Sequence, residues 1–207
     1  MNLPQQEKNV LHFSDLSLNV VQSDLDNFLL PYKENIVVIS LDQKFQNTDY
    51  QKFLRAKVIF KDSASANKVR LELNLKKIKG HSVRIMWDER DSSIRYNTKS
   101  NLFIKGIPIS VSPREVYEYF MKFGDISSLK IPEDENGTHH GYGYITYYNP
   151  EDAENVIANC KNQTIFGVKL DVEHFQRRNE RNLEFYSTNA RSLYIRNFPS
   201  NYTEEDL

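Results

Sequence analysis

A hydrophobic segment of six residues recurs in this 207-residue chain at a constant interval. The three copies begin at Leu11, Leu102 and Leu193, so both intervals are 91 residues. Each copy shows the alternation of a short, half-buried strand that ends at a turn. A repeat of this length predicts a tandem array of small domains. We expect two complete units and the start of a third, which would make the chain a piece of a longer protein.

The second unit has the clearer pattern of elements. Its first strand is followed by Ser112-Pro113-Arg114-Glu115, a capping box with proline at the first helical position. Apolar residues then recur at helical spacing as far as Phe123, and Gly124 supplies a helix stop. The pattern further predicts strands at 126–131, 141–148 and 168–172, a turn at 134–137, and a helix that Asn149 caps and that runs through Cys160.

The first unit follows the same order with weaker signals. It predicts helices at about 20–30 and 63–73, and strands at 36–41, 55–60 and 83–87. The order βαββαβ predicts an α+β fold, in which two helices cover one face of a four-stranded antiparallel sheet and leave the other face open. The expected domains are 8–90 and 101–176, with linkers at 91–100 and 177–190 and the start of a third unit at 191–207.

An open sheet face can bind single-stranded RNA when flat aromatic rings project from its two central strands, because bases stack on such rings. Strand alternation in the second unit places Phe103, Lys105, Tyr142 and Tyr144 on one face. The alternative is that these aromatics are ordinary core residues. Alternation argues against it, because it directs another set into the core: Leu102, Ile104, Ile145 and Tyr147.

Two of these strands resemble the RNP motifs of the RNA-recognition-motif (RRM) family. Residues 140–147, His-Gly-Tyr-Gly-Tyr-Ile-Thr-Tyr, are similar to the RNP1 pattern, and residues 102–107 are similar to RNP2. The one departure is His140, which stands where Lys or Arg is usual and weakens a phosphate contact at neutral pH. The resemblance implies two tandem RRMs of ferredoxin-like fold that bind single-stranded RNA.

The first unit departs from this pattern at the stacking positions. His12 stands at the position of Phe103, and Arg55 and Lys57 stand where the two stacking tyrosines belong. A basic face can still hold phosphates, and arginine can stack on a base. Two interpretations remain open, namely that this face contacts RNA, or that it binds a protein or nothing. The fold should survive, because the core positions are apolar: Phe13, Ala56, Val58 and Phe60.

The chain also resembles the cytoplasmic poly(A)-binding proteins, most closely over residues 78–105 and again at 134–137 and 178–181. That resemblance implies four RRMs in the full protein, a linker that orders on RNA so that both sheets form one trough, and translation or export factors bound to the helix at 112–123. Glu89 and Asp171 depart from the family by adding negative charge near the RNA path. The departures indicate a diverged fungal paralogue that acts on mRNA stability, translation or export, in the cytoplasm, the nucleus or both. The candidate RNA-binding residues are His12, Arg55, Lys57, Met86, Trp87, Arg95, Asn101, Phe103, Lys105, Lys130, His140, Tyr142, Tyr144 and Arg178.

Charge and cysteine content restrict the other possibilities. The chain has a net charge of −1, but residues 9–90 carry +3 and residues 100–175 carry −5, so the two units must meet a polyanion differently. A single cysteine, Cys160, excludes a disulfide scaffold, and we expect it to be buried. The pair His139 and His140 has no partner residues at metal-ligand spacing. We therefore expect no metal, no cofactor and no enzymatic activity.

Overall fold

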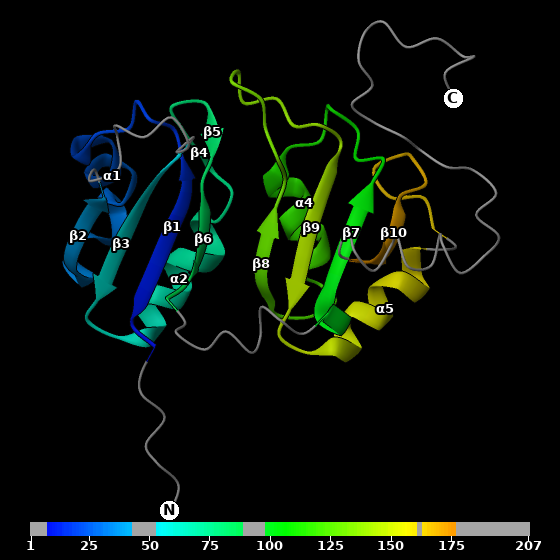
Figure 1. Ribbon diagram of the computed structural model, residues 1–207. Helices are drawn as coiled ribbons and strands as arrows, with labels where there is room; N and C mark the ends of the chain where they lie inside the picture. Colours follow the sequence, from blue (N-terminus) through cyan, green and yellow to red (C-terminus); the bar gives the residue numbers. More distant parts are fainter. Residues whose placement is uncertain (1–7, 43–52, 89–97, 161–162, 177–207) are drawn as a thin grey trace, which may run out of the picture. The chain divides into compact units, whose positions relative to one another are not determined.

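The computed structural model describes residues 8–42, 53–88, 98–160 and 163–176. These residues form two four-stranded antiparallel sheets and one short hairpin, which joins β4 (Lys77–Ile78) to β5 (His81–Ser82). In each sheet the helices lie on one side, and no described helix lies on the other side (Figure 1). The expected α+β class is confirmed. Of the sequence predictions, Glu89, Arg95, Arg178 and the third unit at 191–207 lie outside the described residues.

The first sheet has the strand order β2-β3-β1-β6. Its second helix begins and ends as predicted and is capped by Asp62, whose carboxylate accepts a hydrogen bond from the backbone N–H of Ser65 at 2.7 Å. The first helix is shorter than predicted, because Pro31 has no N–H to continue an α-helix and a 3-10 turn replaces it. The elements are β1 (Val10–Leu16), α1 (Gln22–Phe28), η1 (Leu30–Asn35), β2 (Ile36–Asp42), β3 (Leu54–Phe60), α2 (Ser63–Leu73) and β6 (Arg84–Trp87).

The second sheet has the equivalent strand order β10-β7-β9-β8. The predicted capping box is present: the Ser112 hydroxyl accepts from the Glu115 N–H at 3.2 Å, and the Glu115 carboxylate accepts from the Ser112 N–H at 2.7 Å. Hydrogen bonds from the Ser112 side chain and backbone lower the pKa of Glu115. The elements are η2 (Thr98–Ser100), β7 (Asn101–Lys105), α4 (Pro113–Phe120), β8 (Ile126–Lys130), β9 (Tyr142–Tyr147), α5 (Pro150–Cys160) and β10 (Asp171–His174).

The last strand of the second sheet begins later than the sequence predicts. The expected strand is 168–172, but β10 covers Asp171–His174. Phe166 and Gly167 both have positive φ, at 55° and 78°, and they form a tight turn across which Ile165 pairs with Val168. Val168 therefore closes this turn, and the strand starts three residues further on.

A separate hydrophobic core lies under the helices of each sheet. The predicted core residues are buried in both, including Phe13 and Phe60 in the first and Leu102 and Ile145 in the second. Tyr147 is fully buried, and its hydroxyl donates to the Phe120 carbonyl at 2.8 Å. The burial predicted for Cys160 is confirmed, since only 1% of the residue is exposed, and burial raises the pKa of its thiol to about 11.

Charged side chains connect residues of the two sheets. The guanidinium of Arg70, on α2, is buried, and it donates to the Ile126 carbonyl at 3.1 Å and to the Asp125 carboxylate at 2.9 Å. The Glu133 carboxylate accepts from the backbone N–H of Ser82 at 2.9 Å and from its hydroxyl at 2.6 Å. A buried guanidinium is tolerated only when its donors are paired. No local pattern in the sequence indicates that Arg70 is buried.

Candidate RNA-binding face

The uncovered face of the second sheet presents rows of side chains, because residues directly opposite each other on neighbouring strands share a face. Pairing places Glu173 of β10 opposite Phe103 of β7, Phe103 opposite Tyr144 of β9, and Tyr144 opposite Lys130 of β8. A second row runs from Asp171 through Lys105 to Tyr142. A third row pairs Asn101 of β7 with Thr146 of β9. The sheet thus brings together six of the predicted site residues: Asn101, Phe103, Lys105, Lys130, Tyr142 and Tyr144.

Phe103, Tyr142 and Tyr144 form a contiguous set of rings, here called the aromatic platform. The centroids of Phe103 and Tyr144 lie 5.0 Å apart with an interplanar angle of 24°. Tyr142 lies 5.9 Å from Phe103 and 6.0 Å from Tyr144, in edge contacts with both. All three side chains remain partly exposed. Their π-faces are therefore available for a stacked base.

Two further aromatic side chains extend this platform. The ring of His140 stacks on Tyr142, at a centroid distance of 6.2 Å and an angle of 19°. Phe175 lies 5.6 Å from Tyr144 in an edge contact, and its backbone N–H donates to the Asn101 carbonyl at 2.8 Å. Sequence reasoning missed Phe175, because the predicted strand ended at 172. Had the strand been predicted at Asp171–His174, the aromatic residue directly after it would have indicated a further ring beside the platform.

The cations of this face have carboxylates beside them. The ammonium of Lys105 lies 3.4 Å from the Glu173 carboxylate, 3.7 Å from that of Asp171, and 5.1 Å from the centroid of Phe103. Lys130 lies 4.0 Å from Asp15 of the first sheet. The side chains of Lys105, Asp171 and Glu173 are each at least half exposed, so these ion pairs are weak and can exchange for other partners. The Asn101 side chain accepts a hydrogen bond from the Thr146 hydroxyl at 2.6 Å.

The uncovered face of the first sheet combines a polar row with an apolar one, in which Val10, Ile59 and Val38 lie opposite one another. One row consists of Ser40, Lys57, His12 and Met86, in the order β2-β3-β1-β6. The described outward positions of β1 and β3 hold no Phe, Tyr or Trp. Lys57 forms an ion pair with Asp88. The same face contains a shallow hollow of about 760 Å³, lined by His12, Ser40, Leu41, Asp42, Arg55, Ala56, Lys57 and Asp88.

Trp87 and Met86 lie on opposite faces of β6. Met86 pairs with His12 and shares the uncovered face, whereas Trp87 pairs with the buried Leu11 and packs against the first core. The ring of Trp87 lies 5.6 Å from the guanidinium carbon of Arg70, which is a cation–π distance. The structure therefore does not bring Trp87 into the row that contains Met86 and His12.

A smaller hollow of about 330 Å³ lies where β6 and β8 approach each other. Trp87 reaches its edge, and Arg84 is held there by Asp15 at 2.9 Å and by the Ser128 hydroxyl at 3.2 Å. Asp15 occupies a left-handed conformation, with φ of 61°, where the pairing of β1 shifts register. The hollow joins predicted residues of the first sheet to polar residues of the second: His12, Ser14, Arg55, Arg84, Met86, Trp87, Ser127, Ser128, Thr146 and Tyr148.

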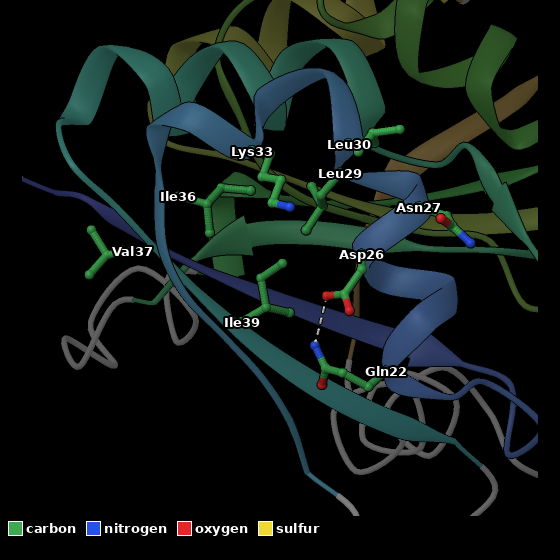
Figure 2. Close-up of a pocket in the computed structure, with 9 residues that line it drawn as sticks. All are labelled: Gln22, Asp26, Asn27, Leu29, Leu30, Lys33, Ile36, Val37 and Ile39. Atoms are coloured by element: carbon green, nitrogen blue, oxygen red, sulfur yellow. Dashed lines mark hydrogen bonds between the residues drawn. The ribbon is translucent and has the colours of Figure 1, made fainter.

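A third hollow, of about 510 Å³, lies on the helix side of the first sheet and so away from the uncovered face. Figure 2 shows its lining, in which Gln22 donates a hydrogen bond to Asp26 at 3.0 Å. Its apolar residues come from the end of α1, from η1 and from the edge strand β2: Leu29, Leu30, Ile36, Val37 and Ile39. The lining contains no aromatic ring. It offers no surface on which a base could stack.

The described residues form neither a metal-ligating cluster nor a membrane-spanning helix. His139 is buried and occupied: Nε2 donates to the Val111 carbonyl at 2.9 Å, and Nδ1 accepts from the Gly141 N–H at 3.0 Å. Within 8–42, 53–88, 98–160 and 163–176, no three metal-ligating side chains come together. No helix in these ranges is long and apolar enough to cross a bilayer.

Comparison with known proteins agrees with this geometry. Residues 102–171 match the family model of the RNA recognition motif, and this part of the chain belongs to that family. It is similar to the "Polyadenylate-binding protein, cytoplasmic and nuclear" of Chaetomium globosum, at 31% identity over 154 residues, which cover 73% of this chain. The chain spans about a fifth of that relative's length, since the match covers 20% of it.

Two solved structures of lower similarity cover most of the chain. A Sxl-lethal protein–RNA complex matches 81% of this chain and 99% of its own, at 17% identity and a TM-score of 0.41. The first two RRM domains of yeast poly(U)-binding protein (Pub1) match the same shares, at 21% identity and a TM-score of 0.36. Neither similarity is high enough to inform function.

Proposed function

We propose that this chain binds single-stranded RNA by stacking bases on Phe103, Tyr142 and Tyr144, and that its target is mRNA. The observation that carries the proposal is the aromatic platform, which lies on an uncovered sheet face and has its rings in mutual contact. Stacking accepts any base, because every base has a π-face. The family match at 102–171 covers the same strands β7 and β9. The process would be post-transcriptional control in the cytoplasm, the nucleus or both.

The remaining residues of the second sheet have supporting roles in this proposal. His140 extends the stacking surface beside Tyr142. Lys130 supplies positive charge at the β8 edge, where a phosphate can approach, and Asn101 is positioned for polar contacts by Thr146. Lys105 sits over Phe103 between two carboxylates, so it can contact RNA only after exchanging one of them. Arg95 and Arg178 are proposed contacts that lie outside the described residues.

The first unit is proposed to be a second RRM with a weaker RNA contact. It repeats the strand order of the family-matched unit, and the proposed domain limits are 8–90 and 101–176 with a linker at 91–100. His12, Arg55, Lys57 and Met86 would contact RNA through charge and guanidinium stacking rather than through aromatic rings. A translation or export factor is the proposed partner of the helical side of the second unit, at α4.

A different function for the first unit is favoured by the composition of its open face. The outward positions that line the hollow of about 760 Å³ hold polar and charged side chains, among them His12, Arg55 and Lys57. Such a surface suits a polar or charged peptide as well as it suits RNA. The second candidate is therefore a protein-binding first unit beside an RNA-binding second unit.

Comparing single-stranded with double-stranded RNA of the same random composition tests the proposal. Bases in a duplex are already stacked on each other and cannot lie on the platform. We expect the single strand to bind the 207-residue chain at least about tenfold more tightly at fixed salt, the equivalent of one stacked base. Equal affinity for the two would show that the platform is not used and that binding is merely electrostatic.

A further inference from the structure

The acidic residues of β10 face the aromatic platform from one side. Glu173 lies directly opposite Phe103 across the β10–β7 pairing, and its carboxylate reaches Lys105 at 3.4 Å over the same ring. Neighbouring strands are about 4.8 Å apart. A base stacked on Phe103 therefore has the Glu173 carboxylate within hydrogen-bonding reach of one edge.

The charges at the two ends of the row that contains Phe103 determine which edge of the base faces Glu173. The row ends in Glu173 at β10 and in Lys130 at β8, with Phe103 and Tyr144 between them. The sugar–phosphate backbone is an anion, so it is repelled from the β10 side and attracted to the β8 side. The edge that points away from the sugar is the Watson–Crick edge. It is this edge that turns toward Glu173.

An ionised carboxylate can only accept hydrogen bonds, and it has two oxygens with which to do so. Guanine offers two adjacent donors on its Watson–Crick edge, N1–H and the N2 amino group. Adenine and cytosine each offer one amino group beside an acceptor nitrogen, and uracil offers one N–H between two carbonyls. Only guanine satisfies both carboxylate oxygens without bringing an acceptor against them.

We propose that Glu173 is a specificity-determining residue that selects guanine for the nucleotide stacked on Phe103. This inference rests on the proposed RNA-binding function. Lys105 does not oppose the exchange, because its ammonium, which lies between Glu173 and Asp171, is half exposed and water can solvate it when Glu173 turns to the base. All three side chains are substantially exposed, so the rearrangement disrupts no buried ion pair.

Selection from a random RNA pool tests this with the 207-residue chain and two variants, Glu173→Gln and Asp171→Asn. Both variants remove one negative charge from the same face of β10, but only Glu173 lies opposite Phe103. We expect guanine to be enriched at one position with the wild type and with Asp171→Asn. With Glu173→Gln, which presents one donor and one acceptor, adenine and cytosine should be admitted at that position.

Replacing the enriched guanine by inosine, which lacks the N2 amino group, gives a second readout. The wild type should bind the inosine RNA about tenfold more weakly, and Glu173→Gln should bind both RNAs equally. Enrichment of guanine that is unchanged in Glu173→Gln, or abolished equally in Asp171→Asn, overturns the assignment. If the wild type retains RNA in which no position is enriched in guanine, the assignment of Glu173 is overturned and the RNA-binding function stands. Failure to retain RNA at all overturns both.

Discussion

The two sheets share their topology and differ in what they present. Both have the same strand order, and both bury alternate apolar residues under two helices. Yet Phe103, Tyr144 and Tyr142 of the second sheet have His12, Lys57 and Arg55 as their counterparts in the first. Inward residues determine whether the sheet forms, and outward residues determine what it binds. The fold therefore predicts where a site can lie without predicting its chemistry.

The largest expected effect comes from removing the platform of the second sheet. Tyr142→Ala/Tyr144→Ala should weaken binding of single-stranded RNA by about 30-fold or more, because stacking of a base on one ring is worth about 1–3 kcal/mol. Titration of fluorescent RNA at fixed salt measures it. Both side chains lie on the uncovered face, so the melting temperature should change little.

The matched control is Arg55→Ala/Lys57→Ala, at the equivalent positions of the first sheet. We expect its effect to be clearly smaller, because these side chains provide no aromatic ring for stacking. An affinity within twofold of wild type for the double tyrosine variant would refute the assignment of the platform. Equal reductions in affinity for the two double variants would mean that the sheets do not differ in function.

A second experiment transfers the platform to the first sheet. His12→Phe/Lys57→Tyr places two rings opposite each other across β1 and β3, as Phe103 and Tyr144 lie in the second sheet. If RNA passes over this face, its affinity for the chain should rise about fivefold or more, because even weak stacking of one base contributes about 1 kcal/mol. The single variant His12→Phe serves as the control for added apolar area. An unchanged affinity in both would favour a protein partner for the first sheet.

Salt dependence distinguishes the two faces by a smaller effect. Arg55→Gln/Lys57→Gln should flatten the plot of log affinity against log salt by about 0.7 for each phosphate that these side chains neutralise in the wild type. Tyr142→Ala/Tyr144→Ala should lower affinity and leave this slope unchanged, because a stacked ring releases no counterions. An unchanged slope in the first variant would show that Arg55 and Lys57 do not meet phosphates.

Sequence periodicity predicted most elements and both cores, because strand alternation and helix caps are local signals. The capping box at Ser112 and the limits of α2 are confirmed by the structure. What the sequence did not predict has both local and long-range causes. The turn at Phe166 and Gly167 delays β10, which concealed Phe175 and the pairing of Glu173 with Phe103. The burial of Arg70 depends on the Ile126 carbonyl, 56 residues away.

The smallest expected effect concerns the carboxylates beside the cations of both faces. Asp88 pairs with Lys57 on the first sheet, and Asp171 lies beside Lys105 on the second. Removing either negative charge leaves the cation more available to phosphate and lowers the repulsion of the backbone. Because exposed ion pairs contribute at most about 1 kcal/mol, Asp88→Asn and Asp171→Asn should each strengthen RNA binding by no more than about fivefold. Titration at low and high salt measures this increase, which should shrink as salt rises. Tighter binding by Asp171→Asn but not by Asp88→Asn would mean that phosphates approach the second sheet alone. Equal increases would extend the RNA path across both sheets, with stacking on one face and charge on the other.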